Sequence, residues 1–272
     1  MREFFGIGGY QRTPSGAYSA EHLLFVGSLL LIMVVLAVIL GNKNKFKSEK
    51  EKTKVLVWSA VLIDSFEIFK IVSMCIRSSL EGGDVARTLL QELPLFLCSI
   101  QLITIPLAAF SKGRVKEAAI DFVCCFGILG AIFGTIGAAQ NYACFPVLSL
   151  DNVCSGITHS ISGFASLYIM FARMAEMKKK NLVITFSILF SFCAVAYIVN
   201  IIIDYNYMFL MSDDGTPYSI IFSLVNGSPV LYPIFVVLLF VIYIFAFYAV
   251  FGLLNRKSKA VIEVETKEEA TV

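Results

Sequence analysis

The sequence predicts an all-α, polytopic membrane protein with seven transmembrane helices. Of its 272 residues, 58% are hydrophobic and only 15% are charged, and the mean hydropathy is +0.80. Soluble domains carry about 25% charged residues, so composition alone indicates an integral membrane protein. The net charge of +2 gives no reason to expect a nucleic-acid partner, and none is predicted.

Seven apolar stretches are each close to the roughly 20 residues that a helix needs to cross a bilayer. A short N-terminal arm, residues 1–19, precedes them and lacks the features of a signal peptide. Ser19 can cap the first helix. The transmembrane domain is expected to cover 20–254, with a charged tail at 255–272. Its spans are expected at 20–40, 55–76, 85–110, 118–138, 155–172, 182–203 and 230–254.

Basic residues are strongly biased toward one set of loops. The loops after the first, third and fifth spans, together with the tail, contain 17 Lys and Arg residues, against 4 on the opposite side. Because cytoplasmic loops are the ones enriched in Lys and Arg, we expect the N-terminus outside, the C-terminus inside, and the protein in the cell membrane.

The third span contains the most unusual stretch, Glu92-Leu-Pro-Leu-Phe-Leu-Cys-Ser-Ile-Gln101. Pro94 has no N–H, so the carbonyl of Leu90 loses its helical partner and the helix is expected to kink. Inside lipid that carbonyl needs another donor, which favours a protein-lined cavity. On a continuous helix Gln91, Pro94, Cys98 and Gln101 would share one face. Cys98 is then either a reactive thiol or a small packing residue.

Other polar residues are expected between the membrane midplane and the outer surface. Charged groups in a membrane are functional candidates, but residues at i, i+3 spacing in the second span can also pair as a structural clasp. The residues in question are Asp64, Glu67 and Lys70 of the second span, His159 of the fifth, and Asn200 and Asp204 at the end of the sixth.

His159 is the only histidine inside an expected span. It is either a hydrogen-bonding packing residue on a face of small side chains or a general base that activates a thiol. We expect spans three and five to be neighbours, with Cys98 and His159 facing one cavity. A sulfur-to-nitrogen distance within about 5 Å would suit a nucleophile and its base.

The remaining cysteines and the outer segments give weaker signals. Cys124, Cys125 and Cys193 are interpreted as packing residues. Cys144 and Cys154 are expected in the loop after span four, where an oxidising environment would allow them to bridge. Residues 216–225 are expected to form a short interfacial helix or a lid. One histidine in the spans is too few for a catalytic metal centre, and no cofactor is expected.

Two motifs carry a resemblance to known proteins. Leu93-Pro-Leu-Phe-Leu-Cys98 and Asn206-Tyr-Met-Phe-Leu210, with His159, resemble the YwaF family of bacterial integral membrane proteins. That family is similar to the animal transmembrane protein 164, a cysteine-dependent lipid acyltransferase. It is more distantly similar to the androgen-induced intramembrane hydrolases, which cleave fatty esters with a threonine and a histidine. The resemblance implies that Cys98 is a nucleophile and His159 its base.

Together these observations favour acyl transfer or hydrolysis on a membrane phospholipid or lysolipid. Gln101, Gln91 or Asn200 can donate to an oxyanion, and Glu67 or Asp64 can orient the histidine. Asp204 and Asn206 complete the expected polar cavity. The alternative is a transporter or solute-binding protein that uses Asp64, Glu67 and Lys70, and a third possibility is a membrane scaffold without chemistry.

Overall fold

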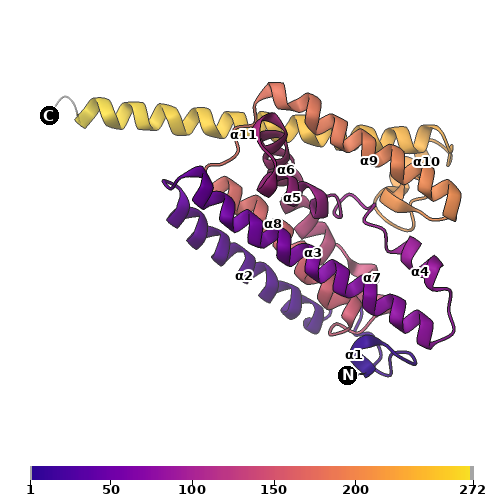
Figure 1. The fold of residues 1–272 in the computed structure, drawn as a ribbon. Coiled ribbons are helices and arrows are strands. Elements are labelled where there is room, and N and C mark those ends of the chain that lie inside the picture. The colour runs from indigo at the N-terminus through magenta and orange to yellow at the C-terminus, as the bar shows by residue number, and fades with distance from the viewer. Residues whose placement is uncertain (1, 270–272) are drawn as a thin grey trace.

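The computed structural model describes the backbone of residues 2–269 and the side chains of residues 2–253. Within that range the chain is helical and contains no strand (Figure 1). The α-helices are α1 (Arg2–Phe5), α2 (Ala20–Asn44), α3 (Glu49–Leu80), α4 (Val85–Gln91), α5 (Gln101–Phe110), α6 (Gly113–Thr135), α7 (Ala139–Cys144), α8 (Leu150–Phe171), α9 (Leu182–Ile203), α10 (Ser219–Leu224) and α11 (Leu231–Glu269). Two 3-10 turns, η1 (Lys179–Asn181) and η2 (Tyr207–Phe209), flank α9.

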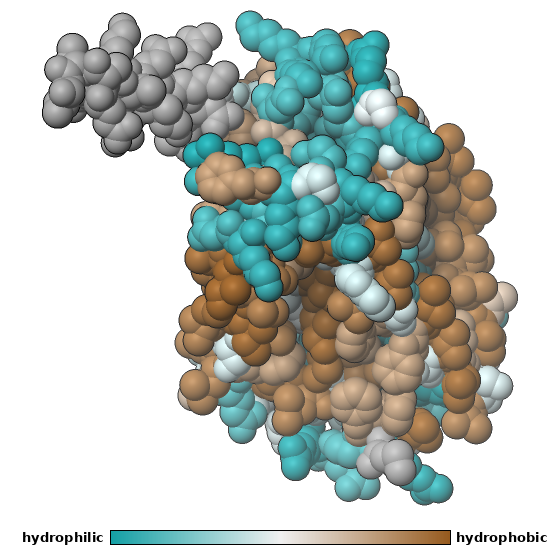
Figure 2. Space-filling model, turned by 60° about the vertical axis from the view of Figure 1, so that its left-hand side comes forward, coloured by the Kyte–Doolittle hydropathy of each residue, from teal (hydrophilic) through white to brown (hydrophobic). Residues whose placement is uncertain are grey.

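The surface is that of a membrane protein. Within the described residues, four helices, α2, α6, α9 and α11, are long and apolar enough to cross a membrane. Their outward faces leave large aliphatic and aromatic side chains exposed. Figure 2 shows these side chains as an apolar belt, with polar residues gathered at its two ends. Such an arrangement is stable only where the belt faces hydrocarbon.

Helix α6 lies at the centre of the molecule and takes part in two apolar cores. The first core joins α6 to α3, α5 and α8. The second joins α6 to α9, α11, η2 and the residues 92–100 that connect α4 to α5. We call residues 92–100 the linker. It therefore lies where the two halves of the bundle meet (Figure 1).

The sequence places the sixth span and the first helix start correctly. The sixth span, 182–203, has the bounds of α9. Ser19 is the N-cap of α2, and its hydroxyl accepts a hydrogen bond from the N–H of His22 at 3.2 Å. The second span was predicted too short, because a capping box formed by Ser48 and Glu51 begins α3 within the lysine-rich stretch. These bonds from Ser48 lower the pKa of the Glu51 carboxyl.

The prediction of one kinked helix over 85–110 is wrong. The helix ends at Gln91, the linker is not helical, and a new helix begins at Gln101. Gln91, Pro94, Cys98 and Gln101 therefore do not share a helix face. The helix is interrupted at Pro94 and not merely bent. The interruption is possible because neighbouring side chains bind the backbone groups that it releases.

The last helix extends beyond the expected seventh span. α11 continues through Glu269, so the backbone of the expected tail, 255–272, is helical as far as it is described. The side chains of that tail, including its basic residues, and residues 270–272 lie outside the described residues.

Hydrogen bonds tie the basic loops together at one end of the bundle. Lys116 Nζ donates to Thr53 Oγ1 at 2.8 Å, which joins the loops after the first and third expected spans. Arg114 donates to the carbonyl of Lys180 at 2.9 Å, which adds the loop after the fifth. At the other end, Arg77 pairs with Asp151 at 3.2 Å. The two loop sets thus occupy opposite ends of the bundle.

The segments expected on the outer side differ in part from expectation. Cys154 lies inside α8 and is buried, whereas Cys144 ends α7 and is exposed, and both are free. The expectation that both lie in one loop is wrong for Cys154, because Ser149 caps α8 five residues before it. A short helix, α10, forms within the segment 216–225, at Ser219–Leu224.

Candidate active site

The N-terminal end of the linker is fixed to α3 by ion pairs. Lys70 Nζ lies 2.9 Å from Glu67 Oε1 and 3.1 Å from Glu92 Oε2. All three side chains are at most 19% exposed. The predicted i, i+3 pairing is confirmed for Glu67 and Lys70, but the third member is Glu92 of the linker and not Asp64. Lys70 therefore holds the linker against α3.

A second contact fixes the linker from the opposite half of the bundle. The hydroxyl of Tyr207 donates to the carbonyl of Leu90 at 2.5 Å and accepts from the N–H of Leu93 at 3.1 Å. This confirms that the carbonyl released by Pro94 finds a protein donor. Asn200 in turn fixes Tyr207, because its Oδ1 accepts from the Tyr207 N–H at 2.6 Å and its Nδ2 donates to the Tyr207 carbonyl at 3.0 Å.

Cys98 lies near the C-terminal end of this doubly anchored linker. Its side chain is half-buried, and its Cα and Cβ lie against Gly130 of α6. The Cys98 Cβ lies 3.6 Å from the point where a β-carbon on Gly130 would stand, and the Ser162 Oγ lies 3.9 Å from the same point. Cys98 of the linker and Ser162 of α8 therefore meet over one glycine of α6.

His159 packs one turn further along the same face of α6. A β-carbon at Gly134 would overlap the imidazole ring of His159, so the ring lies directly on this glycine. His159 and Ser162 are three residues apart on α8, and residues at that spacing are neighbours on a helix surface. Gly130 and Gly134, four apart on α6, likewise share a face. The structure thus brings Cys98, Ser162 and His159 together over two glycines.

Two buried polar atoms, one on Gln101 and one on Ser162, have no hydrogen-bond partner among the described residues. These are Gln101 Nε2 and Ser162 Oγ. Gln101 is fully buried, follows Cys98 by three residues, and donates its backbone N–H to the Cys98 carbonyl at 3.2 Å. Buried polar groups are nearly always hydrogen-bonded. These two unpaired donors therefore need an explanation, and a ligand atom that accepts from them is one.

The other predicted residues lie elsewhere or are already paired. Asn206 binds the loop at Ser212 and Asp214. Asp204 is exposed at the left-handed C-terminus of α9. Asp64 lines a groove between α3 and α5. Gln91, at the end of α4, makes no side-chain hydrogen bond within the described residues. Both polar atoms of the Asn200 side chain, Oδ1 and Nδ2, are hydrogen-bonded to Tyr207, so Asn200 is a poor oxyanion donor.

Sequence reasoning missed the glycines and two of the anchors. Gly130 and Gly134 matter because they allow Cys98 and His159 to pack close to the α6 backbone. The spacing of these glycines and Gly127 along one helix face was the signal in the sequence that could have revealed this. Glu92 was visible as a carboxylate two residues before Pro94. Tyr207 lies inside the motif 206–210, although its hydrogen bonds to residues 90 and 93 cross the bundle.

A comparison with known protein families matches nearly all of the residues described above. A family model described as the TMEM164 family matches residues 17–251. The chain belongs to the TMEM164 family. The TMEM164 match includes Cys98, His159 and both anchors of the linker, and with the apolar helices it identifies a membrane protein. Neither a curated protein nor a solved structure matches the chain.

Proposed function

We propose that the protein is a lipid acyl enzyme in which Cys98 is the nucleophile and His159 its general base. The observation that carries this proposal is that Cys98 and His159 pack against two glycines of one face of α6, Gly130 and Gly134, where Ser162 Oγ is buried without a partner. A thiol in a low-dielectric site needs an adjacent base to become a nucleophile. His159 is the base that this arrangement offers.

The proposed reaction has two steps. His159 accepts the thiol proton while the sulfur attacks an ester carbonyl of a phospholipid, and the ester C–O bond then breaks with formation of a thioester. The imidazolium returns the proton to the leaving alkoxide. In the second step His159 takes a proton from a lysolipid hydroxyl or from water, whose oxygen attacks the thioester and releases the thiol.

Gln101 Nε2 and Ser162 Oγ are the proposed donors to the oxyanion of each step. Both are buried and without a partner, so they need not break an existing bond to act. Such preorganised donors stabilise developing charge at no reorganisation cost. We expect a sulfur-to-nitrogen distance within about 5 Å between Cys98 and His159.

We further propose a seven-span topology that presents this site toward the outer leaflet of the cell membrane. The spans would be α2, α3, α4 with α5, α6, α8, α9 and α11. The grouping of the basic loops at one end supports it. A reporter inserted near Asp151 should read as external, and one fused after Leu254 as cytoplasmic. Reporters on the same side would contradict this topology.

The function is tested by a lipid assay on purified protein in nanodiscs. Wild-type protein and the variants Cys98→Ala, His159→Ala and Cys75→Ala are given phospholipid and lysolipid, and the products are measured by mass spectrometry. Cys98→Ala should abolish turnover, and His159→Ala should lower it by about 100-fold or more. Cys75→Ala replaces another half-buried cysteine and should keep full activity. An active Cys98→Ala variant would overturn the proposal.

A second candidate function is transport, and the Glu67–Lys70–Glu92 ion pair favours it. Charges held inside a membrane frequently mark ion or solute pathways. Flux of protons or solutes into proteoliposomes that survives in Cys98→Ala but not in Lys70→Met would support this candidate. If neither residue affects lipid turnover or flux, the scaffold interpretation remains.

A further inference from the structure

A buried carboxylate, Asp121, lies on α6 near the end of the bundle that carries the basic loops. It is 1% exposed and accepts hydrogen bonds from three groups. The Met177 N–H donates to its Oδ1 at 3.2 Å, and Asn181 Nδ2 and the Tyr248 hydroxyl donate to its Oδ2 at 2.8 and 3.4 Å. Met177 and Asn181 belong to residues 172–181, which we call the α8–α9 connection. The carboxylate therefore lies where α6, α11 and this connection meet.

No cation pairs with Asp121 within the described residues, although lysines are close to it in the chain. Lys178 and Lys180 of the α8–α9 connection each lie 3.6 Å from Glu117 instead. Lys178 also pairs with Glu176 at 2.5 Å. A buried charge is costly unless an opposite charge or a bound metal compensates it. The neutral donors around Asp121 solvate its charge but do not cancel it.

The amide that donates to Asp121 also carries a buried acceptor without a partner. Asn181 is 1% exposed, and its Oδ1 makes no hydrogen bond among the described residues. The bond lengths of an amide place its oxygen and nitrogen about 2.3 Å apart, so Asn181 Oδ1 lies within about 5 Å of the Asp121 Oδ2. A hard cation binds oxygen at about 2.4 Å and can therefore contact both atoms.

Two hydroxyl groups add further oxygen atoms beside this pair. The buried Thr185 hydroxyl donates to the Asn181 carbonyl at 3.2 Å and lies 3.4 Å from the Tyr248 hydroxyl. Carboxylate and carbonyl oxygens suit hard cations, whereas transition metals favour imidazole and thiolate. Because the affinity for Ca²⁺ depends on the number of charged ligands, a single carboxylate is better matched to a cation of charge +1.

We propose that Asp121 and Asn181 bind a monovalent alkali cation, Na⁺ or K⁺. The cation contacts the Asp121 carboxylate and Asn181 Oδ1, neutralises the buried charge and gives the unpaired oxygen its partner. It thereby ties the α8–α9 connection to α6. Asp121 precedes Gly130 by nine residues, or about 14 Å along the helix. The site is thus separate from Cys98, and the proposal does not depend on the acyl chemistry.

Thermal unfolding in detergent tests the site, with the metal alone as the probe. The full chain is purified in N-methylglucamine chloride, which NaCl or KCl then replaces at constant ionic strength. NaCl, KCl or both should raise the unfolding temperature of the wild-type protein by about 3 °C or more, with saturation as the concentration rises. Equal unfolding temperatures in all three salts would overturn the proposal. Stabilisation by CaCl₂ or MgCl₂ without any by NaCl or KCl would overturn the monovalent assignment.

Two variants identify the oxygen atoms that bind the cation. Asp121→Asn should abolish the stabilisation by alkali cations, because it removes the only charge of the site. Asn181→Ala removes the unpaired oxygen and should raise the concentration for half of the effect on the order of tenfold. A folded Asp121→Asn protein with the response of the wild type would overturn the proposal. The comparison of salts in wild-type protein decides the question even if both variants fail to fold.

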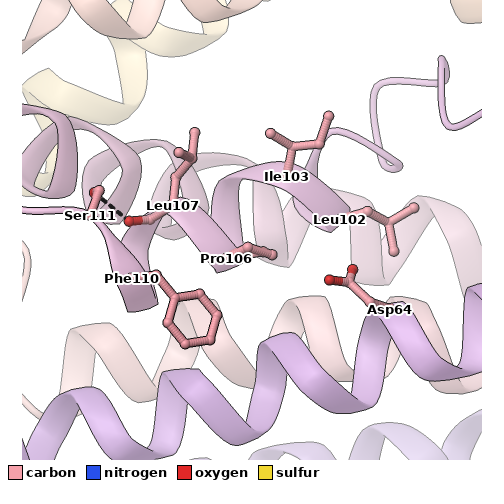
Figure 3. Close-up of a pocket in the computed structure, with 7 residues that line it drawn as sticks. All are labelled: Asp64, Leu102, Ile103, Pro106, Leu107, Phe110 and Ser111. Carbon is pink, nitrogen blue, oxygen red and sulfur yellow. Dashed lines mark hydrogen bonds between the residues drawn. The ribbon is translucent and has the colours of Figure 1, made fainter.

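Asp64→Asn is the matched control. Asp64 likewise has no ion pair among the described residues, but it lines a groove of about 490 Å³ between α3 and α5 (Figure 3). The other side chains of that groove are apolar except Ser111, whose hydroxyl donates to the Leu107 carbonyl. A carboxylate without a second free oxygen should not bind the cation, so Asp64→Asn should keep the full response to NaCl and KCl. Loss of the response in Asp64→Asn, with the response retained in Asp121→Asn, would overturn the assignment to Asp121.

Discussion

The two buried polar groups on either side of the linker differ in how their hydrogen bonds are satisfied. On the side of α9, Asn200 and Tyr207 pair every polar atom they present to each other and to the linker. On the side of α6 and α8, Gln101 Nε2 and Ser162 Oγ are buried without a partner. Both groups lie beside the linker, yet the hydrogen bonds of the first group are all formed and those of the second are not.

We relate this difference to the proposed function: one polar group anchors the linker, and the other is available to a ligand. A satisfied network fixes a backbone break in one conformation, because every alternative leaves a buried group unpaired. An unsatisfied group costs free energy and is tolerated where a ligand completes it. The linker is thus rigid where Tyr207 and Lys70 hold it, and Cys98 is presented where the donors are still free.

The largest effect on stability should come from the ion-paired anchor. Lys70→Met leaves Glu67 and Glu92 as neighbouring unpaired carboxylates, and should lower the free energy of unfolding by about 3–5 kcal/mol. Thermal unfolding in detergent, followed by circular dichroism, measures it. The triple variant Glu67→Gln, Lys70→Met, Glu92→Gln removes all three charges and should recover most of the loss. A Lys70→Met protein as stable as wild type would mean that the anchor does not hold the linker.

Asn200→Ala should have the next largest effect. It deprives the backbone N–H of Tyr207 of its partner and leaves the Tyr207 carbonyl with only the Leu210 N–H at 3.3 Å, and should cost about 2–3 kcal/mol. The same unfolding measurement applies, with Ser187→Ala as control, because Ser187 is exposed and bonds only within its own helix. An unchanged melting temperature for Asn200→Ala would show that the satisfied network is dispensable.

Gly130 and Gly134 of α6 provide a matched pair of substitutions. Gly134→Ala places a methyl group on the His159 ring and should cost about 1–3 kcal/mol of stability, together with most of the activity. Gly130→Ala meets Cys98 at 3.6 Å, an ordinary contact, and should leave the fold unchanged. Equal effects on lipid turnover from both substitutions would contradict the positioning of His159 by Gly134.

The smallest effect on stability, with a clear effect on activity, should come from Ser162. Ser162→Ala removes a hydroxyl that makes no hydrogen bond, so stability should stay within about 0.5 kcal/mol, while turnover falls by about tenfold or more. Ser166→Ala is the control for which the opposite result is expected. Its hydroxyl donates to the Cys124 carbonyl at 2.6 Å, so that variant should lose about 1 kcal/mol and keep its activity. The reverse pattern would remove Ser162 from the site.

The sequence predicts the class and the region of the site because both follow from local chemistry. Apolar runs indicate membrane helices, and Pro94 must release the carbonyl of Leu90 wherever the helix lies. The length of the non-helical linker does not follow from Pro94, since it depends on Tyr207 and Lys70, which arrive from other helices. Similarly, Lys70 has a local partner in Glu67, but its second partner, Glu92, is set by how α3 packs against the linker.

The positions of the proposed nucleophile and base are harder to predict for the same reason. Counting residues along straight helices separates Cys98 from His159 in depth, and that estimate assumed a continuous helix through Cys98. The break lets the linker lie across Gly130, while Gly134 admits the His159 ring. Close approach to a helix backbone depends on which glycines face inward, and only the packing of α6 against α8 decides that.

The central claim is that Cys98 carries the acyl group, and detection of its thioester tests this most directly. Protein in nanodiscs is incubated with a phospholipid bearing an isotope-labelled acyl chain, digested, and analysed by mass spectrometry before and after hydroxylamine. The account predicts a hydroxylamine-sensitive acyl adduct on Cys98, lowered by about 100-fold in His159→Ala. An adduct distributed equally over Cys75, Cys98 and Cys144, or product formation without any adduct on Cys98, would contradict it.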